Sequence, residues 1–518
     1  MKHLCALGLW LLIAGQAFGQ SSFEQIVEAE KKEAAHIYKS ERSGAENNDN
    51  IIYHRIELFA NPQVDYIKGR VTTYFIATTA MQSIGFDLTD SLHVDSVYYH
   101  GAMLSFSHAA NVININLPVT INTGQTDSIC VYYEGVPGYS GFGSFVQTYH
   151  NDTVPVIWTL SEPYGAKDWW PCKQDLADKI DSFDILVTTP QQYKVASNGL
   201  LMEVTHQDTF ATWHWKHRYP IATYLVCFAV TNFDTFYNYV PFHGDTLPVV
   251  NFVWPEHLND AQNGTPLVVP AMQLYDSLFG RYPFDKEKYG MTEFGWGGGM
   301  EHQTMTFLTD FGFELITHEL AHHWFGDKVT CGSWSEIWLN EGFATYLTAL
   351  CYENIAPQYY KLYKSQKITS ATLVPDGSVY CYDTSSVNNI FNGSLSYSKG
   401  GMVLNMLRWE LGDSLFFLSL RNYLADTTLA YRFATTPDLE RHFEETSGRD
   451  FSGFFSKWVY GKGFPSYQIT WSQDFSNHVT LTIHQTQSDP SASFFDLPLP
   501  LQFKNDYRDT TITFNNTY

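Results

Sequence analysis

The pattern of apolar and polar positions changes twice along the chain. Residues 51–240 contain short runs of alternating apolar and polar side chains separated by turn residues, which is typical of β-strands. Residues 241–463 carry apolar side chains at the spacing of a helix face, and alternation returns over residues 464–518. We therefore expect a multidomain α+β protein with an N-terminal all-β domain, a mostly helical domain and a partial C-terminal β segment.

The first twenty residues have the composition of a secretory signal peptide. Lys2 gives a positive start, residues 4–15 form an apolar run, and small residues precede a cleavage point at Gln20. This run is too short to span a membrane, and no later segment approaches the roughly 18 unbroken apolar residues of a membrane helix. We predict a signal peptide over residues 1–19, a secreted or periplasmic mature chain without a membrane span, and a polar leader over residues 20–50.

Composition narrows the class of protein further. Charged residues make up 16% of the 518 residues, and hydrophobic residues make up 44%, which excludes a disordered or fibrous chain. The net charge of −23 argues against nucleic acid as a main partner, because phosphate binding needs a basic surface. The cysteines beyond the predicted signal peptide lie far apart in sequence, mostly in apolar strings. The sequence is therefore compatible with buried thiols and with disulfides.

The helical part of the chain contains a zinc-binding motif, His318-Glu319-Leu320-Ala321-His322. Residues four apart lie on one face of a helix, so His318 and His322 can bind one zinc ion while Glu319 faces the water beside it. Catalytic zinc sites usually have a third protein ligand and one open position. Glu341 lies at the start of a second helix-like stretch, after a turn, and is the predicted third ligand. The sequence thus predicts one Zn²⁺ per chain.

His323 needs a separate interpretation. It lies about 100° around the predicted helix from His322, so it does not share the face of the two ligand histidines well. We expect it to pack or to support the site rather than to bind the metal.

These motifs resemble the M1 family of zinc aminopeptidases, a group of gluzincins. The spacing of His318, His322 and Glu341 is that of the family, and residues 298–302 are similar to its Gly-x-Met-Glu-Asn exopeptidase motif. Residues 397–400 resemble the segment that carries the family's catalytic tyrosine. Thr159-Leu160-Ser161-Glu162-Pro163 is similar to an N-terminal-domain segment that reaches the active site. The resemblance runs from about Ile51 to the end, and it implies a saddle-like β-domain and a thermolysin-like catalytic domain.

The resemblance also implies roles for the matched residues. Glu319 is the general base and Tyr397 stabilises the oxyanion, while Glu301 and Glu162 anchor the free α-amine of a peptide substrate. Further substrate-binding residues implied by the motif are Gly298, Gly299, Met300 and His302. His302 stands where the family usually has Asn. The large C-terminal helical domain of many members does not follow in this sequence, which indicates a more open site, a shorter subgroup or an incomplete chain. With the predicted signal peptide, the resemblance implies a short, secreted zinc aminopeptidase.

Two other functions compete with this hypothesis. A thermolysin-like metalloendopeptidase shares the histidine pair and the downstream glutamate, but Glu301 in its motif argues against it. A catalytically dead secreted binding protein is the other alternative, and the intact Glu319 argues against that.

Overall fold

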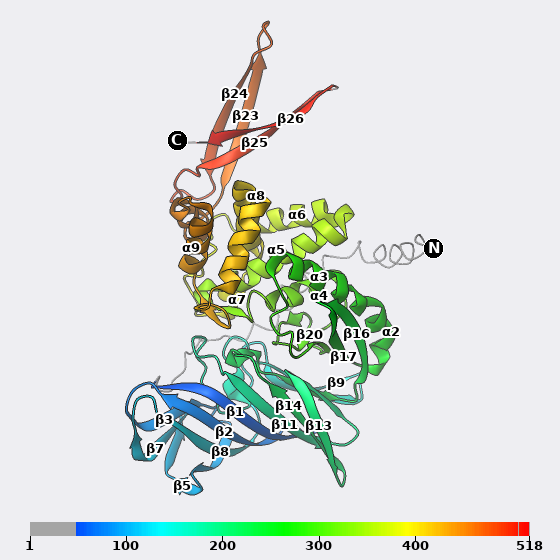
Figure 1. Cartoon of the computed structure of the whole chain (residues 1–518), viewed down its shortest axis with the longest axis vertical. Coiled ribbons are helices and arrows are strands. Elements are labelled where there is room, and N and C mark those ends of the chain that lie inside the picture. Colours follow the sequence, from blue (N-terminus) through cyan, green and yellow to red (C-terminus); the bar gives the residue numbers. More distant parts are fainter. Residues whose placement is uncertain (1–47, 506, 517–518) are drawn as a thin grey trace.

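The computed structural model describes residues 48–505 and 507–516. The predicted signal peptide, residues 1–19, and nearly all of the predicted leader lie outside the described residues, and the first strand, β1, begins at Asp49. Three parts follow one another along the long axis of the molecule, with the β-domain at one end, helices in the middle and two hairpins at the other end (Figure 1). This arrangement confirms the predicted α+β fold.

An eight-stranded sheet forms the bulk of the N-terminal domain, in the order β13-β14-β11-β1-β2-β8-β4-β5. β1 pairs in parallel with β11, and the other neighbouring pairs are antiparallel. Buried positions largely alternate with more exposed ones in β1 and β2, so the period-two pattern of the sequence marks the face that packs on the core. The strands are β1 (Asp49–Ala60), β2 (Ile67–Ala77), β4 (Leu92–Tyr99), β5 (Ala102–Leu104), β8 (Thr126–Gly135), β11 (Ser182–Pro190), β13 (Leu200–Gln207) and β14 (Phe210–His217).

Two smaller sheets complete the N-terminal domain. One has the order β12-β15-β10-β9 and the other the order β3-β7-β6. The strands are β3 (Met81–Asp87), β6 (Phe106–Ala109), β7 (Val112–Ile121), β9 (Ser144–His150), β10 (Val154–Leu160), β12 (Lys194–Ser197) and β15 (Phe228–Thr231). Glu162 lies two residues after the end of β10, and its carboxylate meets Glu301 of the helical domain.

A five-stranded mixed sheet opens the helical domain, in the order β16-β17-β18-β20-β19. The predicted division at residues 240/241 falls inside β16, which pairs along its whole length with β17. β19 has two residues and a single partner, β20, so it lies at the edge of the sheet. The strands are β16 (Asp234–Phe242), β17 (Asp245–Val253), β18 (Tyr289–Glu293), β19 (Gly299–Met300) and β20 (Thr306–Leu308).

Helices α4 and α5 form the centre of this domain. Both helices are buried on all sides, so other elements cover them. The buried residues are 314–322 of α4 and 338–351 of α5. The helices are α2 (Leu258–Gly264), α3 (Val268–Phe279), α4 (Phe313–His322), α5 (Trp338–Ile355), α6 (Pro357–Ala371), α7 (Val387–Ile390), α8 (Gly400–Ala425), α9 (Thr436–Ser447) and α10 (Ser452–Phe455), with π-helical turns η6 (Gly393–Lys399) and η7 (Ser456–Tyr460). A two-stranded sheet joins β21 (Val329–Cys331) and β22 (Arg432–Ala434).

Two hairpins form the predicted C-terminal β segment. β23 (Pro465–Gln473) pairs with β24 (Val479–Gln487), and β25 (Leu497–Lys504) pairs with β26 (Asp509–Asn516). Both project from the helical domain and most of their side chains are exposed (Figure 1).

The cysteines are not joined in disulfides within the described residues. All six of them are unpaired there and five are buried, which favours thiols over disulfides.

Among the described helices, none combines the length and the apolar character that crossing a bilayer would require.

Candidate metal centre and its surroundings

Three side chains from α4 and α5 converge at the middle of the molecule. His318 and His322 lie one turn apart on α4, and Glu341 lies in the first turn of α5. The Nε2 atoms of His318 and His322 lie 3.3 and 3.5 Å from the same atom, Oε2 of Glu341. All three side chains are buried. The two helices predicted from the sequence thus bring the three predicted ligands together.

The spacing of these atoms fits a zinc ion. Ligand bonds of about 2.0–2.1 Å in a tetrahedron place neighbouring ligand atoms about 3.4 Å apart. The two observed separations, 3.3 and 3.5 Å, are close to that value. Two imidazoles and one carboxylate also match the donor set of catalytic zinc sites, which leave one position open. The residues present therefore fit Zn²⁺.

The electrostatics of the site favour a bound cation. Burial lowers the pKa of His318 to about 4, so its imidazole is neutral at pH 7 and has a lone pair to donate. Burial also disfavours protonation of His322, but the charges of Glu341 and Glu301 outweigh it and raise the pKa of His322 well above its usual range. Burial opposes the ionisation of Glu341, yet His322 and His318 hold its pKa down at about 2. The carboxylates thus create a negative field at His322 that a metal ion would neutralise.

Glu319 lies beside this group and against the edge strand β19. Ligand atoms of Glu301, Glu319 and His322 all lie within 4.8 Å of one another. A Cβ atom on Gly299 would lie 2.3 Å from Oε1 of Glu319, so the glycine allows the backbone of β19 to approach the carboxylate. Glu319 can therefore act on a group held between β19 and the metal site.

A second cluster of carboxylates lies next to the metal ligands. Oxygens of Glu162, Glu301 and Glu341 lie within 4.8 Å of one another, and all three side chains are buried. Glu162 comes from the N-terminal domain and Glu301 from the segment after β19, so the two domains meet here. Burial raises the pKa of Glu301, because the low dielectric disfavours its charged form unless a cation is near. The cluster is a site for a positively charged group.

Tyr397 reaches the site from the π-helix η6. Its buried ring stacks on the ring of His318, with 6.0 Å between centroids and 14° between planes. The turn η6 and the start of α8 pack closely on α5, where Gly342 faces Gly400, the first residue of α8. A Cβ on Gly342 would lie 3.0 Å from the carbonyl carbon of Gly400. Because π-helical turns often occur at functional sites, the geometry of η6 agrees with a role for Tyr397.

Comparison with known proteins identifies the family. Residues 50–225 match the family model described as the peptidase M1 N-terminal domain, and residues 269–458 match the peptidase family M1 domain. Together the two models cover well over half of the chain. The chain belongs to peptidase family M1. Zn²⁺ is the cofactor of this family, in agreement with the donor set described above.

Relatives and solved structures agree with membership of family M1. The chain is 24% identical over 436 residues to glutamyl aminopeptidase of Bos taurus, covering 76% of this chain and 44% of the relative. It is 28% identical over 353 residues to aminopeptidase M1-C of Oryza sativa subsp. japonica, covering 64% and 39%. The chain thus spans less than half the length of these relatives. The crystal structure of an M1 zinc metallopeptidase from Deinococcus radiodurans superposes with a TM-score of 0.73 at 23% identity, covering 82% of this chain and 96% of that one, which shows a shared fold.

The remaining residues of the segment 298–302, which resembles the family's exopeptidase motif, play different structural parts. Met300 pairs with Phe307 in the sheet, and the carbonyl of Gly298 accepts hydrogen bonds from the backbone and hydroxyl of Thr309. His302 is buried with its ring 4.4 Å from that of Phe307, and burial lowers the pKa of His302 to about 3, so it is neutral at pH 7. It belongs to none of the metal-capable groups found among the described residues.

His323, which follows the second ligand of the M1 motif, faces away from the metal site. Its Nδ1 atom lies 2.9 Å from the hydroxyl of Tyr282, and its Nε2 atom lies 3.4 Å from Oγ1 of Thr306. The buried carboxylate of Asp327 lies 3.7 Å from Nε2. The ring therefore packs behind α4, as its position on the helix predicts.

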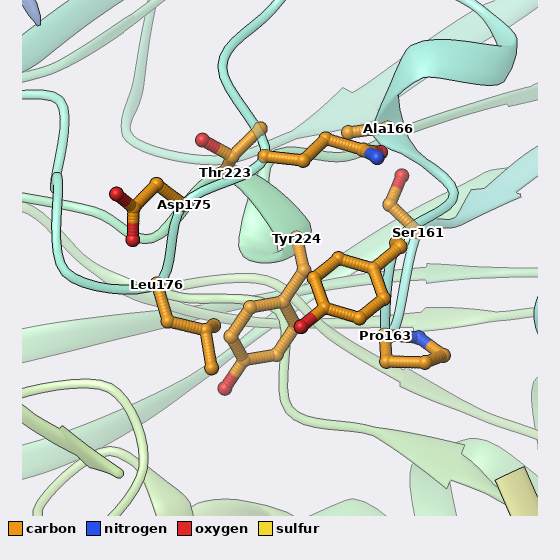
Figure 2. Close-up of a pocket in the computed structure, with 9 residues that line it drawn as sticks. Ser161, Pro163, Ala166, Asp175, Leu176, Thr223 and Tyr224 are labelled. Atoms are coloured by element: carbon orange, nitrogen blue, oxygen red, sulfur yellow. The ribbon is translucent and has the colours of Figure 1, made fainter. Parts of the chain in front are cut away.

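Sequence reasoning missed Tyr224. Its buried hydroxyl donates to Oε1 of Glu301 over 3.4 Å, and Asn340 of α5 donates to that hydroxyl over 3.5 Å. Tyr224 also lines a small pocket in the N-terminal domain with Ser161 and Pro163, which flank Glu162 (Figure 2). A lone tyrosine in an apolar string has no spacing signal, so nothing in the sequence marks its contact with Glu301.

Proposed function

We propose that this M1 peptidase is a secreted zinc aminopeptidase that removes N-terminal residues from peptides. The observation that carries the proposal is the carboxylate cluster of Glu162 and Glu301 directly beside the three metal-binding side chains. Glutamyl aminopeptidase of Bos taurus and aminopeptidase M1-C of Oryza sativa subsp. japonica, by their names, support the same reaction class.

His318, His322 and Glu341 would hold the zinc ion. When bound, Zn²⁺ polarises the scissile carbonyl and lowers the pKa of water so that hydroxide is available near neutral pH. Glu319 accepts the proton of the attacking water on its carboxylate and later delivers it to the leaving nitrogen. Tyr397 donates a hydrogen bond from its hydroxyl to the oxygen of the former carbonyl, where negative charge develops.

The carboxylate cluster selects the N-terminus of the substrate. Glu301 and Glu162 accept hydrogen bonds from the α-ammonium group, and this charge pairing keeps both carboxylates ionised despite burial. An internal peptide segment lacks the positive charge, so it would leave buried carboxylates unpaired. The free edge of β19 can pair with the backbone of the peptide, because Gly299 leaves it open to close approach. The first peptide bond is thereby placed beside Glu319.

The decisive experiment compares two substrates that differ in the α-amine alone. We expect the zinc-loaded protein to cleave an amino-acid arylamide and to leave the N-acetylated form intact. Metal analysis of the same preparation is expected to give one zinc per chain, lost in the variant His322→Ala. Equal cleavage of the acetylated substrate, or cleavage of internal bonds in a blocked peptide, would instead indicate an endopeptidase.

Export of the protein is a separate part of the proposal. It rests on the signal-peptide pattern of residues 1–19, which lie outside the described residues. Expression of the full chain in a secreting host is expected to yield an exported protein that starts at Gln20 by N-terminal sequencing. An intracellular product that retains Met1 would contradict export and leave the catalytic proposal unaffected.

A further inference from the structure

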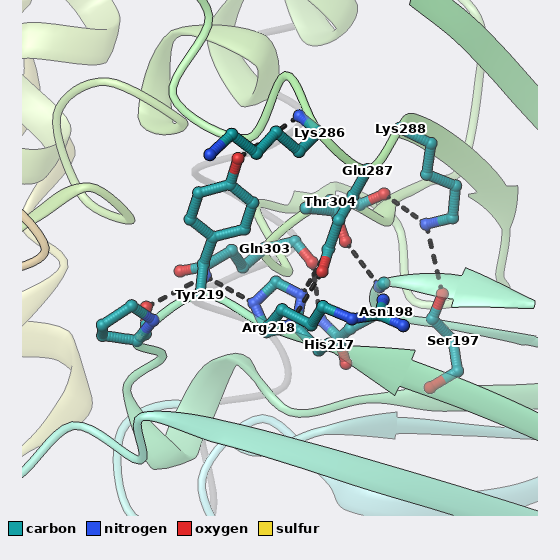
Figure 3. Close-up of polar contacts among 12 residues, drawn as sticks. Ser197, Asn198, His217, Arg218, Tyr219, Lys286, Glu287, Lys288, Gln303 and Thr304 are labelled. Carbon is teal, nitrogen blue, oxygen red and sulfur yellow. Dashed lines mark hydrogen bonds and ion pairs between the residues drawn. The ribbon is translucent and has the colours of Figure 1, made fainter.

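The turn after Glu301 is fixed by side chains of the N-terminal domain. The backbone N–H of Met305 donates to the carbonyl of His302 over 2.8 Å and closes the turn. At its centre, Nε2 of Gln303 lies 2.7 Å from Nε2 of His217, at the end of β14, and donates to the carbonyl of Pro220 over 3.0 Å (Figure 3). Gln303 is completely buried, and its contact with His217 is shielded from water.

The orientation of His217 explains why Gln303 is an amide. Nδ1 of His217 lies 2.7 Å from a carboxylate oxygen of Glu287, and the other oxygen of Glu287 accepts from the backbone of Arg218. With Nδ1 facing Glu287, Nε2 is the ring nitrogen of His217 that is left to pair with the side chain of Gln303. The side-chain amide of Gln303 can pair with this nitrogen, which an apolar side chain could not do.

The backbone of the same turn is held by a second group of contacts. The side-chain amide Nδ2 of Asn198 donates to the carbonyl of Gln303 over 2.7 Å, and Nζ of Lys288 donates to the carbonyl of Thr304 over 2.7 Å (Figure 3). The N–H of Gly199 donates to the hydroxyl of Thr304 over 2.8 Å. Thr304 has a φ of +65°, a conformation that residues with a Cβ rarely adopt, so these contacts hold the backbone in a strained form.

Glu301 is thus constrained by the N-terminal domain from two sides. Tyr224 of that domain donates to its carboxylate, and Gln303, two residues further on, ties its backbone to β14. We propose that Gln303 is a positioning residue for the amine anchor: through His217 and Pro220 it fixes the turn that sets where the Glu301 carboxylate meets the substrate α-amine. The inference rests on the proposed aminopeptidase function. It identifies Gln303 as the residue on which the position of the Glu301 carboxylate depends.

The test is a double-mutant cycle with the zinc-loaded enzyme and an amino-acid arylamide. Gln303→Met keeps the volume of the side chain and removes both of its hydrogen bonds. A misplacement of about 1 Å can cost on the order of 100-fold, so we expect kcat/KM to fall by about 10- to 100-fold, chiefly through a higher KM. In the Glu301→Ala background the same change is expected to have no further effect, because the residue acts through Glu301.

Two further variants separate positioning from a general loss of stability. Thr304→Val removes the acceptor of Gly199 from the same turn and should reproduce the change in KM, which keeps the test available if Gln303→Met folds poorly. Asn251→Ala is the matched control, since Asn251 is an equally buried amide that donates to Phe236 and Asn238 at the opposite edge of the five-stranded sheet. It is expected to lower stability and leave KM unchanged.

The outcomes distinguish the inference from the function on which it rests. If Glu301→Ala leaves the preference for a free amine unchanged, the proposed function is wrong. If Glu301→Ala abolishes that preference while Gln303→Met and Thr304→Val leave KM unchanged, the positioning role is wrong. Effects of Gln303→Met and Glu301→Ala that multiply in the double variant would also overturn it.

Discussion

Glu319 is the residue on which turnover should depend most directly. Its carboxylate lies within 4.8 Å of a ligand atom of His322 but is not one of the three converging ligands. We expect Glu319→Gln to lower kcat by about 100- to 10,000-fold, because the amide cannot accept the proton of water. Zinc content by metal analysis should stay near that of the wild type. The exposed Glu445 on α9 provides a control, since Glu445→Gln should leave both quantities unchanged; appreciable turnover by Glu319→Gln would refute the base assignment.

Tyr397 can be tested without disturbing its packing. Tyr397→Phe keeps the ring that stacks on His318 and removes the hydroxyl. Loss of one donor to a developing oxyanion should lower kcat by about 100- to 1,000-fold with little change in KM. Steady-state kinetics on an arylamide measure both constants. Tyr346→Phe on α5 removes a buried hydroxyl elsewhere in the domain and should leave kcat near the wild-type value, whereas equal effects of the two changes would show that the loss is structural.

At the residue scale, the sequence predicts those site residues that have a spacing rule. His318 and His322 follow from helix geometry, and Glu341 follows from a second helix after a turn. Tyr224 and Gln303 could not be predicted in this way. Their contacts with Glu301 and His217 join residues 77 and 86 positions apart, and no local pattern encodes such a distance.

At the scale of elements, the contact between α5 and the turn η6 sets the distance from Glu341 to Tyr397. Gly342→Ala would place a Cβ 3.0 Å from the carbonyl carbon of Gly400 and 3.2 Å from the carbonyl oxygen of Ser396. Overpacking of this kind costs about 1–3 kcal/mol of stability, and relief of the contact would move η6 and its tyrosine. We expect kcat to fall at temperatures where the protein is still fully folded, as judged by thermal denaturation.

A glycine without such a neighbour is the control for this substitution. A Cβ on Gly453 in α10 would meet no atom within 4 Å, so Gly453→Ala should leave kcat unchanged. If Gly342→Ala shifts the melting temperature but not kcat of the folded protein, the contact has no part in positioning Tyr397.

Element types were more predictable than element boundaries and pairings. The alternation in β1 and β2 and the helical spacing in α8 are local signals that the fold preserves. β19 has two residues and exists through its pairing with β20, which leaves no periodic signal. The π-helical form of η6 likewise depends on packing against α5, so the sequence pattern indicates a helix start there and no more.

At the scale of the whole molecule, two buried lysines at the contact between the domains link stability to pH. Nζ of Lys179 donates to the carbonyl of Asp327, and Nζ of Lys288 donates to the carbonyl of Thr304. Burial lowers the pKa of both lysines to about 7, from 10.5. The unfolded chain therefore binds more protons above pH 7, so this contribution to the free energy of unfolding grows as pH rises from 7 towards 10 and is lost as pH falls back to 7.

Lys179→Met tests this linkage. The variant lacks one of the two titrating amines. The increase in the free energy of unfolding between pH 6.5 and 8.5 that the two lysines cause should therefore fall by about half. Urea denaturation at several pH values measures the change as a flatter dependence of the midpoint on pH. Lys361→Met on the exposed side of α6 is the control and should leave the slope unchanged. An unaltered slope in Lys179→Met would show that this lysine is charged in the folded protein near pH 7.

The arrangement of the domains goes beyond what the chain's local pattern contains. The carboxylate cluster brings together Glu162, after β10, and Glu301, after β19. The family resemblance alone predicted that these two side chains belong to one site. Local periodicity indicates which face of an element is buried, but it does not say which other element covers it.

The site is also assembled late in the life of the polypeptide. Its parts extend from Glu162 to Tyr397, and translation at about 5–20 residues per second separates the synthesis of these two residues by on the order of 10 to 50 s. A nascent chain that already contains Glu319 and Glu341 still lacks the hydroxyl of Tyr397. A chain that ends within α6 would lack both Tyr397 and α8, which packs on α5, so we expect peptidase activity only once the helical domain is complete.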